Sequence, residues 1–377
     1  MILISLPSTQ PEILTKLLPD NVCAQSASNG SRCEAAAAVG ELAWSPDGNY
    51  LAFTGAQDGI SSDLYVYSTL DNTIKHLTNG PTQAIDPMWS PDGSYIVSAG
   101  AIRMNAGAGD STGPTIDAEW AVRRDGSDLH IIYQSGATEP YRLGWLDNRV
   151  FLQYHDEMGC DTYDIETINI KAPQNNEITG LFASAAFDPS SGNLLVTIPD
   201  EANPYCPIDR KPGVYLFSLH QSMTPKLIDL GNKGLAEILD ESPQAGLFFI
   251  QTDSGVDAVD LQGNDIALDY PSFTRAPSTI VAADGRTWAI FASQPFPGED
   301  GLWIGSLHGK TKSIWSDGMV NDVLWAPDSS YLLFSAFPST SNYQDSYIYQ
   351  AVSPPFQPVE LVGPFEDGAF KISWVMP

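Results

Sequence analysis

A short motif of aromatic, proline, aspartate and glycine residues recurs along the chain at a nearly constant interval. It reads Trp-Ser-Pro-Asp-Gly at Trp44–Gly48 and again at Trp89–Gly93, and Trp-Ala-Pro-Asp-Ser at Trp325–Ser329. Proline presets the backbone torsion of a tight turn, aspartate caps the turn, and glycine takes up the remaining strain. The motif therefore predicts a turn between two strands, with the tryptophan at the end of the first strand, and a structural role.

Weaker copies of the motif lie between these three. The remaining anchor positions, each followed by turn-forming residues or by an isolated strand, are Trp145, Phe187, Glu241, Val281 and Trp374. The mean spacing of all eight anchors is about 47 residues, and this period suits the four-stranded blades of a β-propeller. The repeat therefore predicts an all-β β-propeller with eight blades. Seven blades are the alternative, because the repeat at Glu241 is hard to align.

The two ends of the chain fit the closure of such a ring. The first residues resemble the third and fourth strands of a blade, and the last residues resemble a first strand. We therefore expect a single propeller over residues 1–377. Residues 1–40 supply the outer strands of a composite closing blade and a loop, residues 41–369 form seven contiguous blades, and residues 370–377 supply the inner strand. Such closure hides two sheet edges that would otherwise invite aggregation.

At its Trp-Ser-Pro-Asp-Gly motifs the chain resembles the WD40-like, TolB-type (PD40) propeller repeat, which also occurs in the propeller domains of prolyl-oligopeptidase relatives. The resemblance covers nearly the whole chain and is specific in the first, second and seventh repeats. It implies a propeller fold, often an extracytoplasmic location, and for TolB-like relatives a role as an interaction module. It implies no activity. The chain differs from TolB in having no clear N-terminal α/β domain.

The charge of the chain excludes several classes of partner. Lys and Arg number 18 and Asp and Glu 46, which gives a net charge of −28. Such a surface repels nucleic-acid phosphates and anionic membrane surfaces. No run of eighteen apolar residues occurs, so the sequence predicts no transmembrane helix. A protein is the expected partner.

The four cysteines fall into two pairs by spacing, Cys23 with Cys33 and Cys160 with Cys206. Two disulfides in an exported protein are the interpretation we favour, and four unrelated buried thiols are the alternative. Met1–Leu6 lacks a basic segment and a cleavage site, so it is not a convincing signal peptide. We expect an extracellular, cell-surface or periplasmic location, with the signal or anchor absent from this chain.

Charged residues recur three positions before the anchors, where each first strand would begin at the mouth of the central channel. They are Glu41, Asp86, Arg142, Asp322 and Lys371. One interpretation is a polar or cation-binding funnel, and the other is a hydrated channel with satisfied ion pairs. Long loops on the same face carry binding residues on rigid scaffolds. The further binding candidates are Arg103, His155, Tyr205, Arg210 and Tyr343.

No group of residues matches a catalytic or metal-binding motif in its proper context. Gly109–Gly113 matches the nucleophile-elbow pattern in letters only, because no strand-to-helix turn surrounds it. The five histidines fall in different blades, and only His155 lies near the loop face. Acidic residues at 155–161 and 200–210 could bind Ca²⁺ or transfer protons, or could form a solvated rim. We predict no catalytic residue, no metal site and no cofactor, with Ca²⁺ as the alternative.

These observations favour a noncatalytic recognition or scaffold propeller outside the cytoplasm, which binds a protein or an envelope component through its loop-rich face. Two alternatives stay open. One is a propeller-borne lyase or glycoside hydrolase that uses carboxylates at the channel mouth. The other is an accessory subunit of a cell-surface assembly, with aromatic loop residues as interface anchors.

Overall fold

The structure of the protein is a computed structural model. It describes residues 2–4, 11–13, 42–55, 62–79, 83–104, 114–134, 140–148, 150–157, 162–171, 175–182, 184–189, 191–198, 211–228, 235–238, 247–252, 255–262, 264–266, 269, 271, 277–282, 284–291, 301–307, 309–326, 328–341, 345–352 and 356–366.

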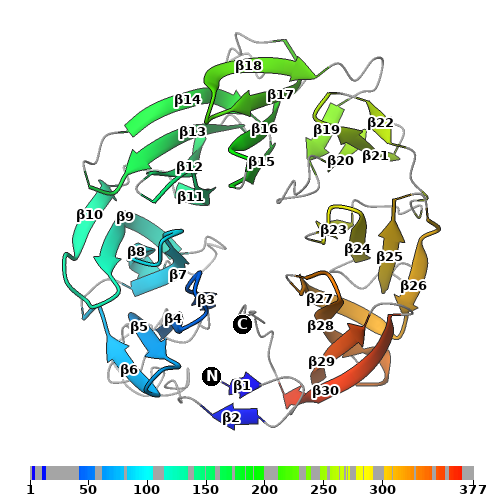
Figure 1. Ribbon diagram of the computed structural model, residues 1–377, viewed down its shortest axis with the longest axis horizontal. Helices are drawn as coiled ribbons and strands as arrows, with labels where there is room; N and C mark the ends of the chain where they lie inside the picture. Colours follow the sequence, from blue (N-terminus) through cyan, green and yellow to red (C-terminus); the bar gives the residue numbers. More distant parts are fainter. Residues whose placement is uncertain are drawn as a thin grey trace. The chain divides into compact units, whose positions relative to one another are not determined.

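The described residues are almost entirely β-strands, arranged as sheets of four consecutive strands (Figure 1). Within each sheet the strands lie in chain order, and each is hydrogen-bonded to its neighbours. Seven such sheets and one two-stranded sheet occur in the described part of the chain. This up-and-down arrangement is the blade that the repeat predicts.

The elements have the following bounds. The two-stranded sheet pairs β1 (Ile2–Ile4) with β2 (Pro11–Ile13), and the first four-stranded sheet contains β3 (Leu42–Trp44), β4 (Tyr50–Gly55), β5 (Asp63–Ser68) and β6 (Thr73–His76). The second contains β7 (Gln83–Trp89), β8 (Tyr95–Met104), β9 (Pro114–Arg123) and β10 (His130–Gln134). The third contains β11 (Pro140–Trp145), β12 (Val150–Glu157), β13 (Thr162–Asn169) and β14 (Asn175–Phe182). The other four sheets contain β15 (Ser184–Asp188), β16 (Asn193–Ile198), β17 (Gly213–Ser218) and β18 (Ser222–Ile228); β19 (Leu235–Ile238), β20 (Leu247–Thr252), β21 (Gly255–Asp260) and β22 (Asp265–Ile266); β23 (Ser278–Val281), β24 (Thr287–Phe291), β25 (Leu302–Ser306) and β26 (Lys312–Trp315); and β27 (Gly318–Trp325), β28 (Tyr331–Pro338), β29 (Asp345–Val352) and β30 (Gln357–Glu366), with a 3₁₀ turn η2 (Ser339–Ser341) after β28.

The recurring motif forms the predicted turn between the first and second strands. In the β3–β4 turn, the Ser45 hydroxyl donates a hydrogen bond of 2.6 Å to Asp47 Oδ1, and the Asn49 amide donates one of 3.1 Å to the same oxygen. Gly48 has a φ of 69°, the left-handed conformation that favours glycine. The same bonds recur at Asp92 in the β7–β8 turn. The turn assignment from the sequence is therefore confirmed at these two motifs.

Two anchor tryptophans tie their own sheet to the sheet before it. The indole Nε1 of Trp89 donates to the carbonyl oxygen of Ala43 at 2.8 Å, and that of Trp325 donates to the carbonyl oxygen of Ile280 at 3.0 Å. Ala43 and Ile280 each directly precede an anchor of the preceding repeat. The indole N–H therefore bonds to the first strand of the preceding sheet. Tryptophan suits this position because it combines an apolar ring with a hydrogen-bond donor.

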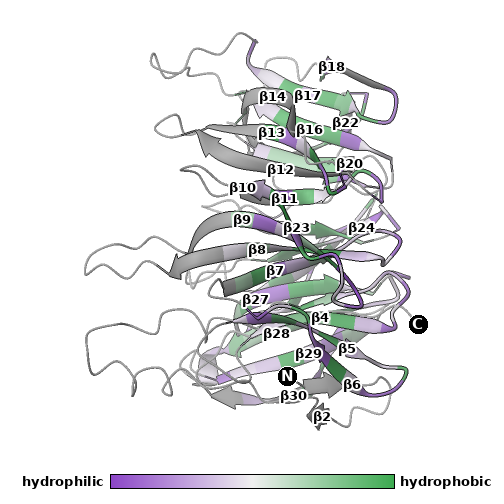
Figure 2. Ribbon diagram, turned by 90° about the vertical axis from the view of Figure 1, so that its left-hand side faces the viewer, coloured by the Kyte–Doolittle hydropathy of each residue, from purple (hydrophilic) through white to green (hydrophobic). Residues whose placement is uncertain are grey.

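Contacts divide the chain into two compact units. Unit 1 consists of residues 1–156, 165–177 and 373–377, and unit 2 consists of residues 157–164 and 178–372. Figure 2 shows hydrophobic residues along strands such as β4, β16 and β17, and hydrophilic residues at the turns. Each unit buries these strands by packing one sheet against the next.

In unit 1, the apolar core lies between consecutive sheets. Leu64 of β5 and Trp89 of β7 belong to one buried cluster, and Val97 of β8 and Trp145 of β11 belong to another. Burying one such side chain stabilises the fold by roughly 2 kcal/mol. Packing between the faces of the sheets therefore helps to hold neighbouring repeats together.

Unit 2 follows the same plan. Leu195 of β16 packs with Phe248 of β20, and Phe249 of β20 packs with Trp288 of β24, whose rings are 5.4 Å apart at their centroids. Another cluster unites Phe291 of β24 with Phe334 of β28. Each cluster again spans two consecutive sheets, so the repeat determines packing as well as local structure.

Candidate functional site

Two charged residues that the sequence places at the starts of first strands lie in direct contact in unit 1. Arg142 of β11 donates a hydrogen bond from Nη2 to Oδ2 of Asp86 of β7, at 2.5 Å. Both strands are irregular here: pairing shifts between Ile85 and Met88 in β7, and between Arg142 and Gly144 in β11. Asp86 also has a φ of 50°, which is uncommon for a residue with a side chain. The bulges therefore aim the two side chains at each other.

The two side chains of this ion pair differ strongly in their exposure to solvent. The Arg142 side chain is 2% exposed, whereas the Asp86 side chain is 59% exposed. The positive charge is held inside the protein, and the carboxylate faces water. An incoming molecule therefore meets the negative member of the pair.

A third charged residue, Glu119 of β9, completes the cluster. It is 0% exposed, its Oε2 lies 3.5 Å from Nη1 of Arg142, and neither carboxyl oxygen has a hydrogen-bond partner among the described residues. Burial raises the pKa of the Glu119 carboxyl to about 7, while the Arg142 guanidinium lowers it and the Asp86 carboxylate raises it. The cluster of Asp86, Glu119 and Arg142, called here the Arg142 cluster, thus contains one buried cation between two acids.

Sequence reasoning missed Glu119. The available signal was a charged residue inside an apolar strand segment, since its neighbours in the sequence are Ala118, Trp120 and Ala121. In the sheet, Glu119 lies opposite Ala99 of β8 and Tyr133 of β10. A carboxyl group on a central strand is rarely buried without a purpose or a partner.

In unit 2, two residues that also stand three positions before an anchor are joined by an uncharged hydrogen bond. Ser184 of β15 and Ile238 of β19 also stand three residues before their anchors, and the Ile238 amide donates to the Ser184 hydroxyl at 2.9 Å. The Ser184 hydroxyl also lies 2.7 Å from the Thr197 hydroxyl. Asp322 lies in β27 opposite Ser335, beside another pairing shift. These first-strand positions therefore join neighbouring sheets in both units.

A polar pair in the first four-stranded sheet was also missed. His76 at the end of β6 lies with Nε2 3.2 Å from Oδ2 of Asp63 at the start of β5, and Asp63 is 2% exposed. The His76 ring stacks on Tyr65, with centroids 4.5 Å apart. His76 is the last residue of β6, where the chain leaves this sheet for β7. Cross-strand pairing of Tyr65 with His76 brings the imidazole to that carboxylate.

Several predicted site residues lie outside the described residues. They are Glu41, Tyr205, Arg210, Tyr343 and Lys371, together with the four cysteines, Cys23, Cys33, Cys160 and Cys206. Arg103 lies in β8 and His155 in β12, but their side chains are not described. The binding and disulfide assignments at these positions stay predictions.

Among the described residues, no three or more His, Cys, Asp or Glu side chains are grouped so that they could hold a metal ion. In the same part of the chain, no helix has the length and apolar character needed to cross a membrane.

Comparisons with known proteins identify the repeat and the fold. The family model described as WD domain, G-beta repeat, matches residues 30–60. A search of curated protein sequences found no match. Among solved structures, an oligogalacturonate lyase from Vibrio parahaemolyticus is 13% identical with a TM-score of 0.53, and the match covers 84% of this chain and 89% of the lyase.

Two peptidases have similar folds over part of their length. A prolyl endopeptidase is 12% identical with a TM-score of 0.56, and dipeptidyl peptidase 4 of Porphyromonas gingivalis is 12% identical with a TM-score of 0.53. These matches cover 92% and 85% of this chain, but the chain spans only 52% of either peptidase. Identity this low shows the fold alone. The chain therefore has a β-propeller fold, and one segment of it matches the WD40 repeat model.

Proposed function

We propose that this chain is a noncatalytic recognition propeller that works outside the cytoplasm and binds a protein partner at the Arg142 cluster. The observation that carries the proposal is the exposed Asp86 carboxylate, held by a guanidinium that is itself buried. A carboxylate fixed in this way is a preorganised acceptor on a rigid sheet edge, so a partner loses little entropy in meeting it. WD40-like propellers commonly act in protein interactions, which supports the proposal.

The partner would present a Lys or Arg side chain to Asp86. Charge-assisted bonds from such cations to carboxylates are about twice as strong as neutral ones. The net charge of −28 also accelerates encounter with a basic surface, and does so most at low ionic strength. The partner could equally belong to a larger assembly on the cell surface.

The proposed architecture is an eight-bladed ring closed by a composite blade, with seven blades as the alternative. The pairing of β1 with β2 supports a contribution from the N-terminal residues, because Ile2 pairs with Ile13 as two strands of a sheet do. The resemblance of the motifs to TolB-type repeats supports the location outside the cytoplasm. The closing residues 370–377 lie outside the described residues.

The test is to purify the tagged chain gently from its native source, identify the proteins bound to it, and measure their affinity for variants. We expect a stoichiometric partner whose affinity falls at least about tenfold in D86N, since one charge-assisted hydrogen bond is worth about 1.5 kcal/mol or more. D147N is the matched control: Asp147 is also exposed and follows β11 at its other end. An unchanged affinity in D86N would show that the partner binds elsewhere on the chain. Purification of the chain as a monomer with no bound protein would refute the recognition function.

An enzyme is the second candidate, because one observation favours it. The pKa of Glu119 near 7 suits a general acid or base, and a lyase is among the proteins of similar fold. The complete burial of Glu119 argues against direct contact with a substrate. Turnover of acidic oligosaccharides by the native chain, lost in E119Q, would establish this candidate in place of the first.

A further inference from the structure

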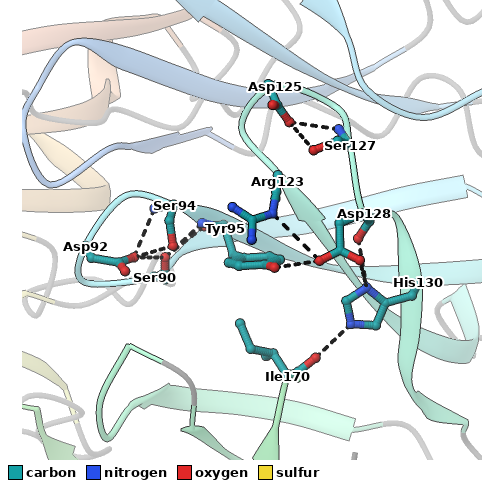
Figure 3. A network of polar contacts seen from close by, with 10 residues as sticks. All are labelled: Ser90, Asp92, Ser94, Tyr95, Arg123, Asp125, Ser127, Asp128, His130 and Ile170. Atoms are coloured by element: carbon teal, nitrogen blue, oxygen red, sulfur yellow. Dashed lines mark hydrogen bonds and ion pairs between the residues drawn. The ribbon is translucent and has the colours of Figure 1, made fainter. Parts of the chain in front are cut away.

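The sheets β7–β10 and β11–β14 meet a second time through His130, the first residue of β10 (Figure 3). Its Nδ1 lies 2.8 Å from the backbone carbonyl oxygen of Asp128, and its Nε2 lies 2.7 Å from the backbone carbonyl oxygen of Ile170, just after β13. The first contact stays within the β9–β10 hairpin. The second joins the two sheets.

Both neighbours of the ring are carbonyl oxygens, which only accept hydrogen bonds. A neutral imidazole carries one N–H group, and the imidazolium carries two. Either neutral tautomer therefore donates to one oxygen and turns a nitrogen lone pair toward the other. The doubly protonated ring is the form that satisfies both contacts.

We propose that His130 is a proton-operated clamp, which joins β10 to the end of β13 when the ring is doubly protonated and releases one of its two hydrogen bonds when it is not. The clamp concerns the same pair of sheets as the Arg142 cluster, but it does not depend on the proposed recognition function. It is carried by the geometry of two carbonyl oxygens around one ring.

Charged groups from each packed element surround the clamp. From the hairpin, Asp128 Oδ1 lies 3.5 Å from His130 Nδ1 and favours the imidazolium. From β8, the Tyr95 hydroxyl donates to Asp128 Oδ2 at 2.6 Å, and this bond is the main reason that the pKa of Asp128 is lowered, so Asp128 stays ionised. Arg123 of β9 and Lys171 after β13 lie over the Tyr95 ring, at 4.9 and 5.5 Å, and oppose a further positive charge.

Two measurements on the full chain test the clamp. The first is the ¹⁵N NMR spectrum of the histidine rings at a mildly acidic pH of about 5.5 and a mildly alkaline pH of about 8. We expect both nitrogens of His130 to be protonated at the lower pH and one at the higher. A ring with a single proton at the lower pH would overturn the proposal without any variant.

The second measurement is amide hydrogen exchange of β10 and of the segment at Ile170, corrected for intrinsic rates. One hydrogen bond is worth about 1 kcal/mol, so we expect exchange about fivefold faster at the higher pH. H130Q should abolish this pH response, and H220Q should keep it, because His220 is an exposed residue in the β17–β18 turn. An unchanged response in H130Q, or none in the native chain, would refute the clamp.

Discussion

The Glu119 carboxyl group is enclosed completely, and its proton affinity follows from that enclosure. The guanidinium of Arg142 offers partial compensation at 3.5 Å, yet burial dominates and the pKa rises to about 7. Protonating Glu119 leaves Asp86 as the remaining anion of the cluster. At the scale of single residues, the Arg142 cluster therefore changes charge near neutral pH.

The raised pKa of Glu119 predicts that the native fold loses stability as pH increases. The folded state binds the proton more tightly than the unfolded state, so unfolding free energy falls between about pH 4.5 and about pH 7 and is level above. A shift of this size corresponds to roughly 3 kcal/mol. Urea unfolding across this range should show the decline in the native chain and a flatter profile in E119Q. E360Q, at an exposed residue of β30, should retain the native profile.

Two substitutions at Gly93 test whether this turn needs the left-handed backbone conformation. Gly93 has a φ of 65°, and an added Cβ would meet Pro46 Cδ at 3.6 Å, an ordinary contact. The cost of G93A is therefore conformational, about 1 kcal/mol, and G93N should cost less because Asn tolerates this conformation. Thermal unfolding of the two variants checks the order. Equal losses would show that the turn does not need the left-handed conformation.

At the scale of elements, two pairs of consecutive sheets are joined by the same contact. The indole of an anchor tryptophan fills the space between two sheets and donates to the first strand of the earlier one, as Trp89 does to Ala43. Local turn chemistry and packing between repeats thus come from the same five-residue motif.

Removing this donor should weaken packing between β3 and β7. We expect the free energy of unfolding to fall by about 1 kcal/mol more in W89F than in W288F, because the partly buried carbonyl oxygen of Ala43 would lose its donor. Trp288 is the matched control, since it is fully buried and its Nε1 has no hydrogen-bond partner among the described residues. Chemical denaturation compares the two. A larger loss in W288F would show that ring volume outweighs the hydrogen bond.

At the scale of the whole molecule, the fold and the charge act in different ways. The β-propeller is a fold that supports many functions, so the fold alone does not specify an activity. The excess negative charges, which sum to −28, repel one another within the folded chain and attract basic partners from solution.

Self-repulsion predicts stabilisation by salt. Raising ionic strength from about 0.02 M to about 0.5 M shortens the screening length severalfold, and we expect Tm to rise by a few degrees. Calorimetry in NaCl and KCl of equal ionic strength measures the effect, and screening requires the two salts to agree. A fall in Tm would mean that the attractive ion pairs of the fold outweigh the repulsion.

The sequence by itself determined the turns at the clear motifs and the strands on either side of them, because these depend on neighbours within a few residues. The spacing of the motifs also placed Asp86 and Arg142 at matching positions of consecutive repeats. Only the tertiary structure decided that Arg142 is buried, that Asp86 is exposed, that Glu119 lies between sheets, and that His130 meets Ile170. These contacts join residues 56 and 40 positions apart, and burial depends on how one sheet packs on the next. Local patterns carry no information on that packing.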